Sequence, residues 1–214
     1  FIIHYFGFPQ AIEEIRKICE SKRLVLIEDC AHALLSCLNG REAGTYGDIG
    51  IYSIRKSLPV PDGGVLLINN PSIDFSGTPA PRPPARITTL KDTLRIFLKK
   101  ARSCNAVFYL IFDLVLVKPF VFMKKFMKQS GPIIREQDDY RDFDIGCANA
   151  GMSRSAKRIM ESMSGHKIVE QRRRNYFFLL NALRGLKGIT VLHQALNDGV
   201  CPLFFPVLIE NRDD

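Results

Sequence analysis

The sequence lacks the residue spacings that build metal sites. Its six cysteines include no Cys-x-x-Cys pair, and its four histidines are scattered, so no cluster has zinc-site spacing. The cysteines are residues 19, 30, 37, 104, 147 and 201, and the histidines are residues 4, 32, 166 and 193. We therefore expect no metal ion. Unpaired cysteines within apolar stretches are typical of reduced thiols in a cytosolic protein, so the expected location is the cytoplasm.

Long apolar runs and several common catalytic motifs are missing as well. The uninterrupted part of the most apolar region runs only from Ala106 to Phe112, far short of the roughly 20 residues that a membrane-spanning helix needs. The sequence contains no Gly-x-Ser-x-Gly, no phosphate-loop string and no Gly-x-Gly-x-x-Gly. These absences argue against a serine hydrolase of the α/β type, a phosphate-loop NTPase and a dinucleotide-binding fold.

Positive charge is confined to one segment. The chain has a net charge of +8, but residues 77–135 hold 12 Lys/Arg and only 2 Asp/Glu. Basic residues alternate there with Phe, Leu and Val, which suggests amphipathic helices that make weak contact with an anionic membrane surface. A solvated basic face over a packed helical pair is the alternative. No recognition motif accompanies the charge, so we expect no nucleic-acid partner.

The first 70 residues alternate between strand and helix signals. Residues 1–5 are apolar and β-rich, residues 11–19 place their apolar side chains on one helical face, and residues 24–27 form a short apolar run. This order predicts a βαβ unit with a parallel sheet, in which residues 24–27 are a strand buried on both faces. Asp29 follows that strand at its carboxyl end, where open α/β sheets bind their ligands.

Two further strands flank a lysine. Residues 47–53 and 63–69 read as strands, and Asn39-Gly40 before them predicts a tight turn. Lys56 is therefore expected on the connecting loop, a usual place for catalytic groups. A lysine amine can form a Schiff base, and a carboxylate such as Asp29 can keep a pyridine nitrogen protonated. These are the two groups that a pyridoxal phosphate (PLP) enzyme needs most.

Four stretches carry a resemblance to a known family. They are His4–Pro9, Ile27–Ala33, Gly47–Ser53, and Lys56 followed by Asp62-Gly63-Gly64. In this order they resemble successive motifs of the DegT/StrS aminotransferases, PLP enzymes of fold type I that mostly aminate keto sugars attached to nucleotides. The resemblance implies an α/β large domain, with a mixed and mostly parallel sheet between helices, followed by part of a smaller α+β domain.

The resemblance also implies roles for individual residues. Lys56 would be the catalytic lysine, Asp29 would bind the pyridine nitrogen, and His32 would stack on the ring. Ser53 would bind the cofactor phosphate. Asn149, within Gly146–Ser153, resembles the asparagine that reaches the phosphate bound in the neighbouring subunit, so a homodimer is expected.

Three segments are predicted along the chain. Residues 1–76 are part of the PLP-binding large domain, residues 77–135 a basic and apolar helical insert or linker, and residues 136–214 part of the C-terminal small domain. Beyond residue 150 the spacing of apolar residues predicts two helices, with Arg172–Arg174 on a solvated helix face. The strand-like sequence at both ends and the absence of an initiator Met lead us to expect an internal piece of a longer protein.

The expected function is transfer of an amino group from an amino acid, such as glutamate, to a keto sugar nucleotide. A related PLP-dependent sugar dehydratase is one alternative, although dehydrating relatives carry a histidine in place of the lysine. The other alternative is a non-catalytic protein of this family that regulates or binds a partner.

Overall fold

The structure is a computed structural model of the chain, and it describes residues 1–76, 81–82 and 149–210. Two compact units are present: Phe1–Pro79 with Met152–Asp214, and Ala80–Gly151. Nearly all described residues belong to the first unit. The basic segment 77–135, apart from Pro81 and Arg82, lies outside the described residues, so its expected membrane contact stays a prediction. The three predicted segment boundaries stay predictions too.

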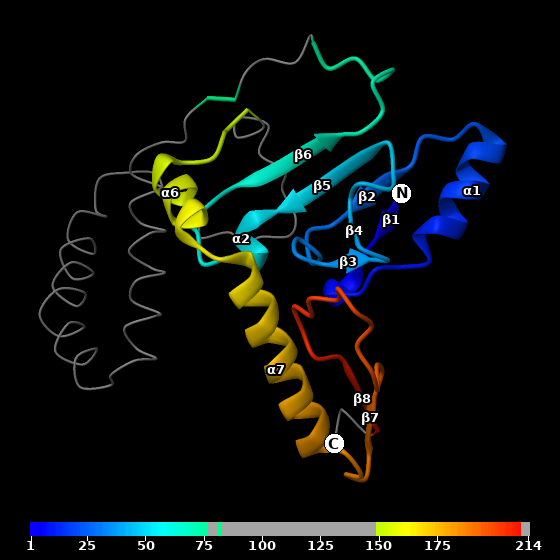
Figure 1. The fold of residues 1–214 in the computed structure, drawn as a ribbon, viewed down its shortest axis with the longest axis vertical. Coiled ribbons are helices and arrows are strands. Elements are labelled where there is room, and N and C mark those ends of the chain that lie inside the picture. Colours follow the sequence, from blue (N-terminus) through cyan, green and yellow to red (C-terminus); the bar gives the residue numbers. More distant parts are fainter. Residues whose placement is uncertain (77–80, 83–148, 211–214) are drawn as a thin grey trace, which may run out of the picture. The chain divides into compact units, whose positions relative to one another are not determined.

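A four-stranded sheet organises the first unit (Figure 1). Its strands are β1 (Ile2–Ile3), β2 (Ile27–Asp29), β5 (Ile49–Ser53) and β6 (Gly64–Ile68), in the order β1-β2-β5-β6. The pairs β1–β2 and β2–β5 are parallel, and β5–β6 is antiparallel. This confirms the predicted mixed, mostly parallel sheet.

Helix α1 (Ile12–Lys22) connects β1 to β2 and confirms the helix predicted at residues 11–19. Glu13 and Glu14 lie in its first turn, where carboxylates complement the helix dipole. Arg23 then caps the helix in the left-handed conformation, with φ of 55°. The backbone must complete this turn before the chain can pair with a neighbouring strand.

The strand predicted at residues 24–27 therefore begins later than expected. Leu24 and Val25 are 58% and 56% exposed and precede β2, which starts at Ile27. Only Leu26 of this apolar stretch is fully buried, where it packs with Ile12 and Tyr46. The expectation of a strand buried on both faces was wrong for its first two residues, because they complete the exit from α1.

The hairpin of β3 (Cys37–Leu38) and β4 (Arg41–Glu42) confirms the turn predicted at Asn39-Gly40. Asn39 and Gly40 have φ of 51° and 77°. A two-residue turn with positive φ at both positions is the type that matches the twist of antiparallel strands.

A single helical turn, α2 (Ile54–Ser57), follows β5 directly and precedes β6. Lys56 lies on this turn, whereas the sequence predicted a loop. The Leu58 N–H donates to the Ile54 carbonyl at 2.8 Å, which closes the turn.

The rest of the unit contains two helices and a pair of strands. Helix α6 (Arg154–Ser162) is capped by Ser153, whose hydroxyl accepts a hydrogen bond from the Ala156 N–H. Helix α7 (Gly165–Leu183) is longer and ends two residues before Gly185, as predicted. Strands β7 (Ile189–Val191) and β8 (Val207–Ile209) form a separate antiparallel pair. None of the described helices has the length and apolar character needed to cross a membrane.

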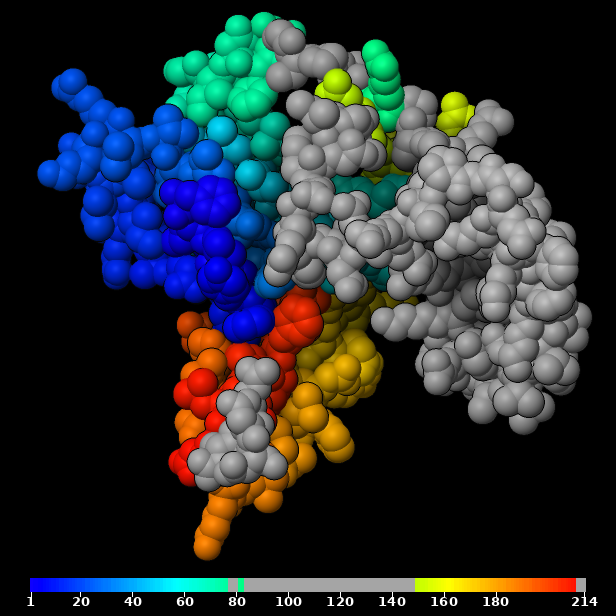
Figure 2. Space-filling model, turned by 180° about the vertical axis from the view of Figure 1, so that it is seen from behind, coloured from blue at the N-terminus to red at the C-terminus, as the bar shows by residue number. Residues whose placement is uncertain are grey.

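Residues near position 200 return to the start of the chain (Figure 2). The Leu203 N–H donates to the Phe6 carbonyl at 2.8 Å, next to the short helix η1 (Tyr5–Gly7). A Cβ atom at Gly7 would lie 2.3 Å from the Cys201 carbonyl oxygen, and the φ of Gly7 is +94°. Only glycine fits this close approach of two backbone segments.

Candidate cofactor site

The candidate site lies at the carboxyl ends of the parallel strands. Asp29 is the last residue of β2, and Ser53 is the last residue of β5. Cys30 continues the pairing, since its N–H donates to the Ile51 carbonyl at 2.7 Å. The sequence predicted ligand-binding groups at this edge, and the side chains it named come from two neighbouring strands there.

Asp29 and Ser53 lie on the same face of the sheet. Asp29 is opposite Ile51 in the parallel register, so these two side chains point to one side. Side chains alternate along a strand, and Ser53 is two residues beyond Ile51, so it shares that side. The carboxylate and the hydroxyl therefore face the same region above the sheet edge.

One oxygen of Asp29 organises the backbone around it. Oδ1 accepts a hydrogen bond of 2.9 Å from the Ala31 N–H, which shapes the turn leading to His32. Among the described residues, no hydrogen bond or ion pair engages the other oxygen. The Asp29 side chain is half-buried, so this oxygen is available for a ligand.

His32 is held between two aromatic rings. Its Nδ1 accepts a hydrogen bond of 3.4 Å from the Phe6 N–H. The imidazole stacks on Phe6 with a centroid distance of 6.2 Å and an interplanar angle of 16°, and Phe204 meets it edge-on at 5.5 Å. These contacts fix the orientation of the ring.

The pKa of His32 reports its charged neighbours. Burial lowers the pKa below its ordinary value, the positive charge of Lys56 lowers it further, and the carboxylate of Asp29 acts in the opposite sense. Both charges therefore lie close enough to act on the imidazole. Asp29 and Lys56 thus both act electrostatically on His32, although the three residues are spread along the chain.

The remaining predicted residues differ in their setting. Lys56 is exposed, and Ser53 precedes α2 without a capping hydrogen bond from its side chain. Asn149 belongs to the second unit, where its carbonyl accepts a hydrogen bond of 2.6 Å from the Arg82 N–H. Its predicted role at the cofactor phosphate stays a prediction.

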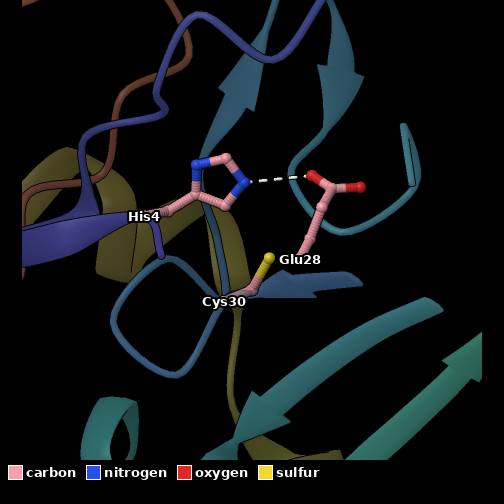
Figure 3. A group of neighbouring side chains, drawn as sticks. All are labelled: His4, Glu28 and Cys30. Atoms are coloured by element: carbon pink, nitrogen blue, oxygen red, sulfur yellow. Dashed lines mark hydrogen bonds and ion pairs between the residues drawn. The ribbon is translucent and has the colours of Figure 1, made fainter. Parts of the chain in front are cut away.

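A buried polar cluster on the opposite face of β2 was missed by the sequence analysis. His4 Nε2 lies 3.0 Å from Glu28 Oε2, and neither side chain is exposed (Figure 3). The two oxygens of Glu28 also accept hydrogen bonds from the N–H groups of Gly44 and Gly47. The signal was an acidic residue that directly follows the apolar run 24–27, because a carboxylate buried there requires partners.

This cluster is built for structure. His4, Glu28 and Cys30 each place a ligand-type atom within 4.8 Å of the others, a spacing that could suit a metal ion. However, His4 Nδ1 accepts a hydrogen bond of 3.0 Å from the Gln10 N–H, so its Nε2 carries the proton donated to Glu28. Burial also raises the pKa of the Cys30 thiol and disfavours the thiolate that a metal would need.

The charge state of Glu28 follows from the same contacts. Burial raises its pKa, but the hydrogen bonds from His4, Gly47 and Gly44 outweigh burial and hold the pKa below its ordinary value. Glu28 is therefore an anion fully surrounded by donors. It ties the loop that precedes β5 to the middle of β2.

The sequence analysis expected the three arginines of α7 to lie on one solvated face, and this expectation was wrong. The guanidinium of Arg172 donates to the Ser57 carbonyl, and that of Arg173 donates to the carbonyls of Asn197 and Val200 at 2.9 Å and 2.8 Å. Only Arg174 remains exposed, and it pairs with Gln171 on its own helix. The helical spacing showed the positions but gave no sign of carbonyl partners from distant segments.

Comparison with known families identifies the first third of the chain. The model of the DegT/DnrJ/EryC1/StrS aminotransferase family matches residues 1–76. Over these residues, the chain is similar to the DegT/DnrJ/EryC1/StrS aminotransferase family. The match covers β1 to β6, the elements that carry Asp29, His32, Ser53 and Lys56.

Two curated relatives show the kind of protein found in this family. A GDP-perosamine synthase of Vibrio cholerae is 34% identical over 70 residues, which are 32% of this chain and 19% of that protein. A dTDP-4-dehydro-2,3,6-trideoxy-D-glucose 4-aminotransferase of Saccharopolyspora spinosa is 36% identical over 74 residues, which are 34% of this chain and 19% of that protein. The matched part thus spans about a fifth of each DegT-family relative.

The fold extends the likeness beyond residue 76. The structure of an E. coli GDP-4-keto-6-deoxy-D-mannose-3-dehydratase with bound hydrated PLP matches with a TM-score of 0.52 at 16% identity. The match covers 99% of this chain and 47% of that chain. At this identity the likeness concerns the fold alone.

Proposed function

We propose that this chain carries the PLP site of an aminotransferase that moves an amino group from an amino acid to a keto sugar nucleotide. The match of residues 1–76 to the model of the DegT/DnrJ/EryC1/StrS aminotransferase family supports the reaction class. The Saccharopolyspora spinosa relative, a 4-aminotransferase named for its dTDP-linked dehydro sugar, supports the substrate class. Glutamate is the simplest donor, and the intact protein is proposed to be a homodimer.

The observation that carries this proposal is the shared face of Asp29 and Ser53 beside Lys56. Asp29 presents an unengaged carboxylate oxygen and Ser53 a hydroxyl on one side of the sheet edge. Lys56 follows on the next turn, and its charge acts on His32. These groups suit a planar cofactor with a ring nitrogen at one end, a phosphate at the other and an aldehyde between them.

Each residue then has a role that its own chemistry supports. Asp29 would hold the proton on the pyridine nitrogen, His32 would pack against the ring, and Ser53 would bind the phosphate. The amine of Lys56 would bind the cofactor covalently and later move protons at the substrate carbon. PLP supplies the aldehyde that takes the amino group from the donor and returns it to the keto carbon of the sugar.

A trapping experiment tests the proposal. The full-length protein is incubated with PLP, reduced with borohydride, digested and examined by mass spectrometry. We expect reduced cofactor on the peptide that contains Lys56, and we expect glutamate added before reduction to remove this label. Lys56→Ala should abolish the label, whereas the control Arg55→Ala, at a neighbouring exposed position, should retain it.

The outcomes separate the alternatives. No label on Lys56 in the unchanged protein would contradict the PLP site and favour a non-catalytic, partner-binding protein. A label that persists in the presence of amino donors would contradict the aminotransferase reaction alone. A dehydratase is disfavoured by the presence of lysine at position 56.

A further inference from the structure

We propose that Arg172 of α7 is a positioning residue that fixes the Lys56 turn relative to His32. The inference rests on the proposed function, because only then is Lys56 the reacting amine. In this inference, helix α7, which lies more than 100 residues after Lys56 in the sequence, helps to set the geometry of the site.

The first contact is made to the residue that follows Lys56. Arg172 Nη2 donates a hydrogen bond to the Ser57 carbonyl. The Ser57 hydroxyl is buried and has no hydrogen-bond partner in the part of the chain that the structure describes. The side chain of Ser57 therefore adds no polar restraint to the turn. Arg172 of α7 instead holds the turn through the main-chain carbonyl of Ser57.

Apolar packing stabilises the turn but does not fix its orientation. Ile54, Leu58 and Val60 are buried against Ala156 of α6, with Met152 alongside. Such packing is not directional. A hydrogen bond from a planar guanidinium is charge-assisted and fixes both distance and angle, so it adds the missing restraint.

The second contact links Arg172 to the other wall of the site. Arg172 Nη1 lies 3.6 Å from Cys201 Sγ. The Cys201 N–H donates to the Ser36 hydroxyl at 3.0 Å, and this hydroxyl lies 2.6 Å from the carbonyl oxygen of Gly7. Three residues beyond Cys201, the ring of Phe204 meets His32. One guanidinium thus contacts both the turn with Lys56 and the segment that leads to the His32 contact.

The neighbouring arginines provide matched controls on the same helix. Arg173 donates to the carbonyls of Asn197 and Val200, so it holds the segment that leads to Cys201, and among the described residues it has no hydrogen bond to α2. Arg174 is exposed and bonded only to Gln171 among the described residues. Three adjacent substitutions therefore separate the loss of the α2 contact from the loss of charge or of general packing.

Hydrogen exchange measured without cofactor tests the restraint. The Leu58 N–H donates to the Ile54 carbonyl within the turn, and the Val60 N–H donates to the Leu58 carbonyl directly after it, each at 2.8 Å. We expect Arg172→Gln to speed their exchange about tenfold, as the loss of a hydrogen bond from a charged donor would. Arg173→Gln should speed exchange only around residues 197–201, and Arg174→Gln should change neither region. Arg172→Lys keeps the charge but loses the planar guanidinium, so its exchange rates should lie between those of the wild type and Arg172→Gln.

Cofactor affinity gives the second measurement. Arg172→Gln should weaken PLP binding about tenfold, whereas Arg174→Gln should leave it unchanged. If Arg172→Gln and Arg174→Gln behave alike in exchange over residues 54–60, the inference fails while the proposed function stands. If the unchanged protein carries no PLP on Lys56, the proposed function fails, and Arg172 loses its role toward the cofactor whatever the exchange data show.

Discussion

The imidazole of His4 donates a hydrogen bond of 3.0 Å to the carboxylate of Glu28, with both side chains fully buried. Donors from the backbone of Gly44 and Gly47 complete the surroundings of this anion. The pair links the end of β1, the middle of β2 and the loop before β5. It therefore fixes the strands whose carboxyl ends form the candidate site.

Glu28→Gln should destabilise the full-length protein by about 3 kcal/mol, because an amide cannot accept all three donors and leaves buried groups unpaired. Denaturant unfolding at pH 7 measures this loss. Glu14→Gln, at an exposed position of α1, is the control and should have little effect. Similar losses for both variants would contradict a structural role for the buried anion.

The contribution of Glu28 should also depend on pH. The pKa of Glu28 is depressed in the folded protein, so its stabilising effect is complete above the unfolded value of about 4.3. The effect is lost as the pH falls through the folded pKa. The stability difference between wild type and Glu28→Gln should therefore shrink below about pH 4. A difference that is constant from pH 7 to pH 3 would contradict this assignment.

Gly7→Ala should destabilise the protein more than Gly40→Ala. Both glycines have positive φ, of 94° and 77°, so both substitutions impose the left-handed penalty of roughly 1–2 kcal/mol. Only at Gly7 would the new Cβ meet another atom, the Cys201 carbonyl oxygen, whereas nothing lies within 4 Å at Gly40. We expect a further loss of about 1–3 kcal/mol for Gly7→Ala, measured by denaturant unfolding. Equal losses would show that the 201–203 segment moves away without cost.

Substitutions of Lys56 and Asp29 should move the pKa of His32 in opposite directions. Lys56→Met removes a charge that lowers this pKa, so the pKa should rise. Asp29→Asn removes a charge that raises it, so the pKa should fall. An NMR titration of His32 in the cofactor-free protein measures both shifts, with Lys17→Met on α1 as the control. If neither substitution changes the pKa of His32, Asp29 and Lys56 do not lie close to His32. The PLP site would then lose this support.

Local patterns predicted much of the fold. Asn39-Gly40 specified its own turn, and the order of apolar runs predicted the parallel strands and α1. The start of β2 was misplaced because Arg23 adopts a left-handed cap, which the apolar character of Leu24 and Val25 conceals. Lys56 was expected on a loop because a single helical turn is too short to show a periodicity.

The site was predictable only where a motif named its residues. Asp29 and Lys56 stood out by residue type and order along the chain. The partnership of His4 with Glu28 joins residues on two strands, and that of Arg172 with Ser57 joins residues 115 positions apart. Such pairs depend on the register of the sheet and the placement of α7, which no single stretch of sequence contains.

Glu28 and Asp29 are adjacent in sequence yet project from opposite sides of β2. Glu28 is enclosed by the protein's own donors, whereas one oxygen of Asp29 has no hydrogen bond within the described part of the chain. If the proposed function holds, substitutions at position 29 would change cofactor binding, whereas substitutions at position 28 would change the stability of the fold. Two neighbouring acids of like charge should thus tolerate very different degrees of replacement.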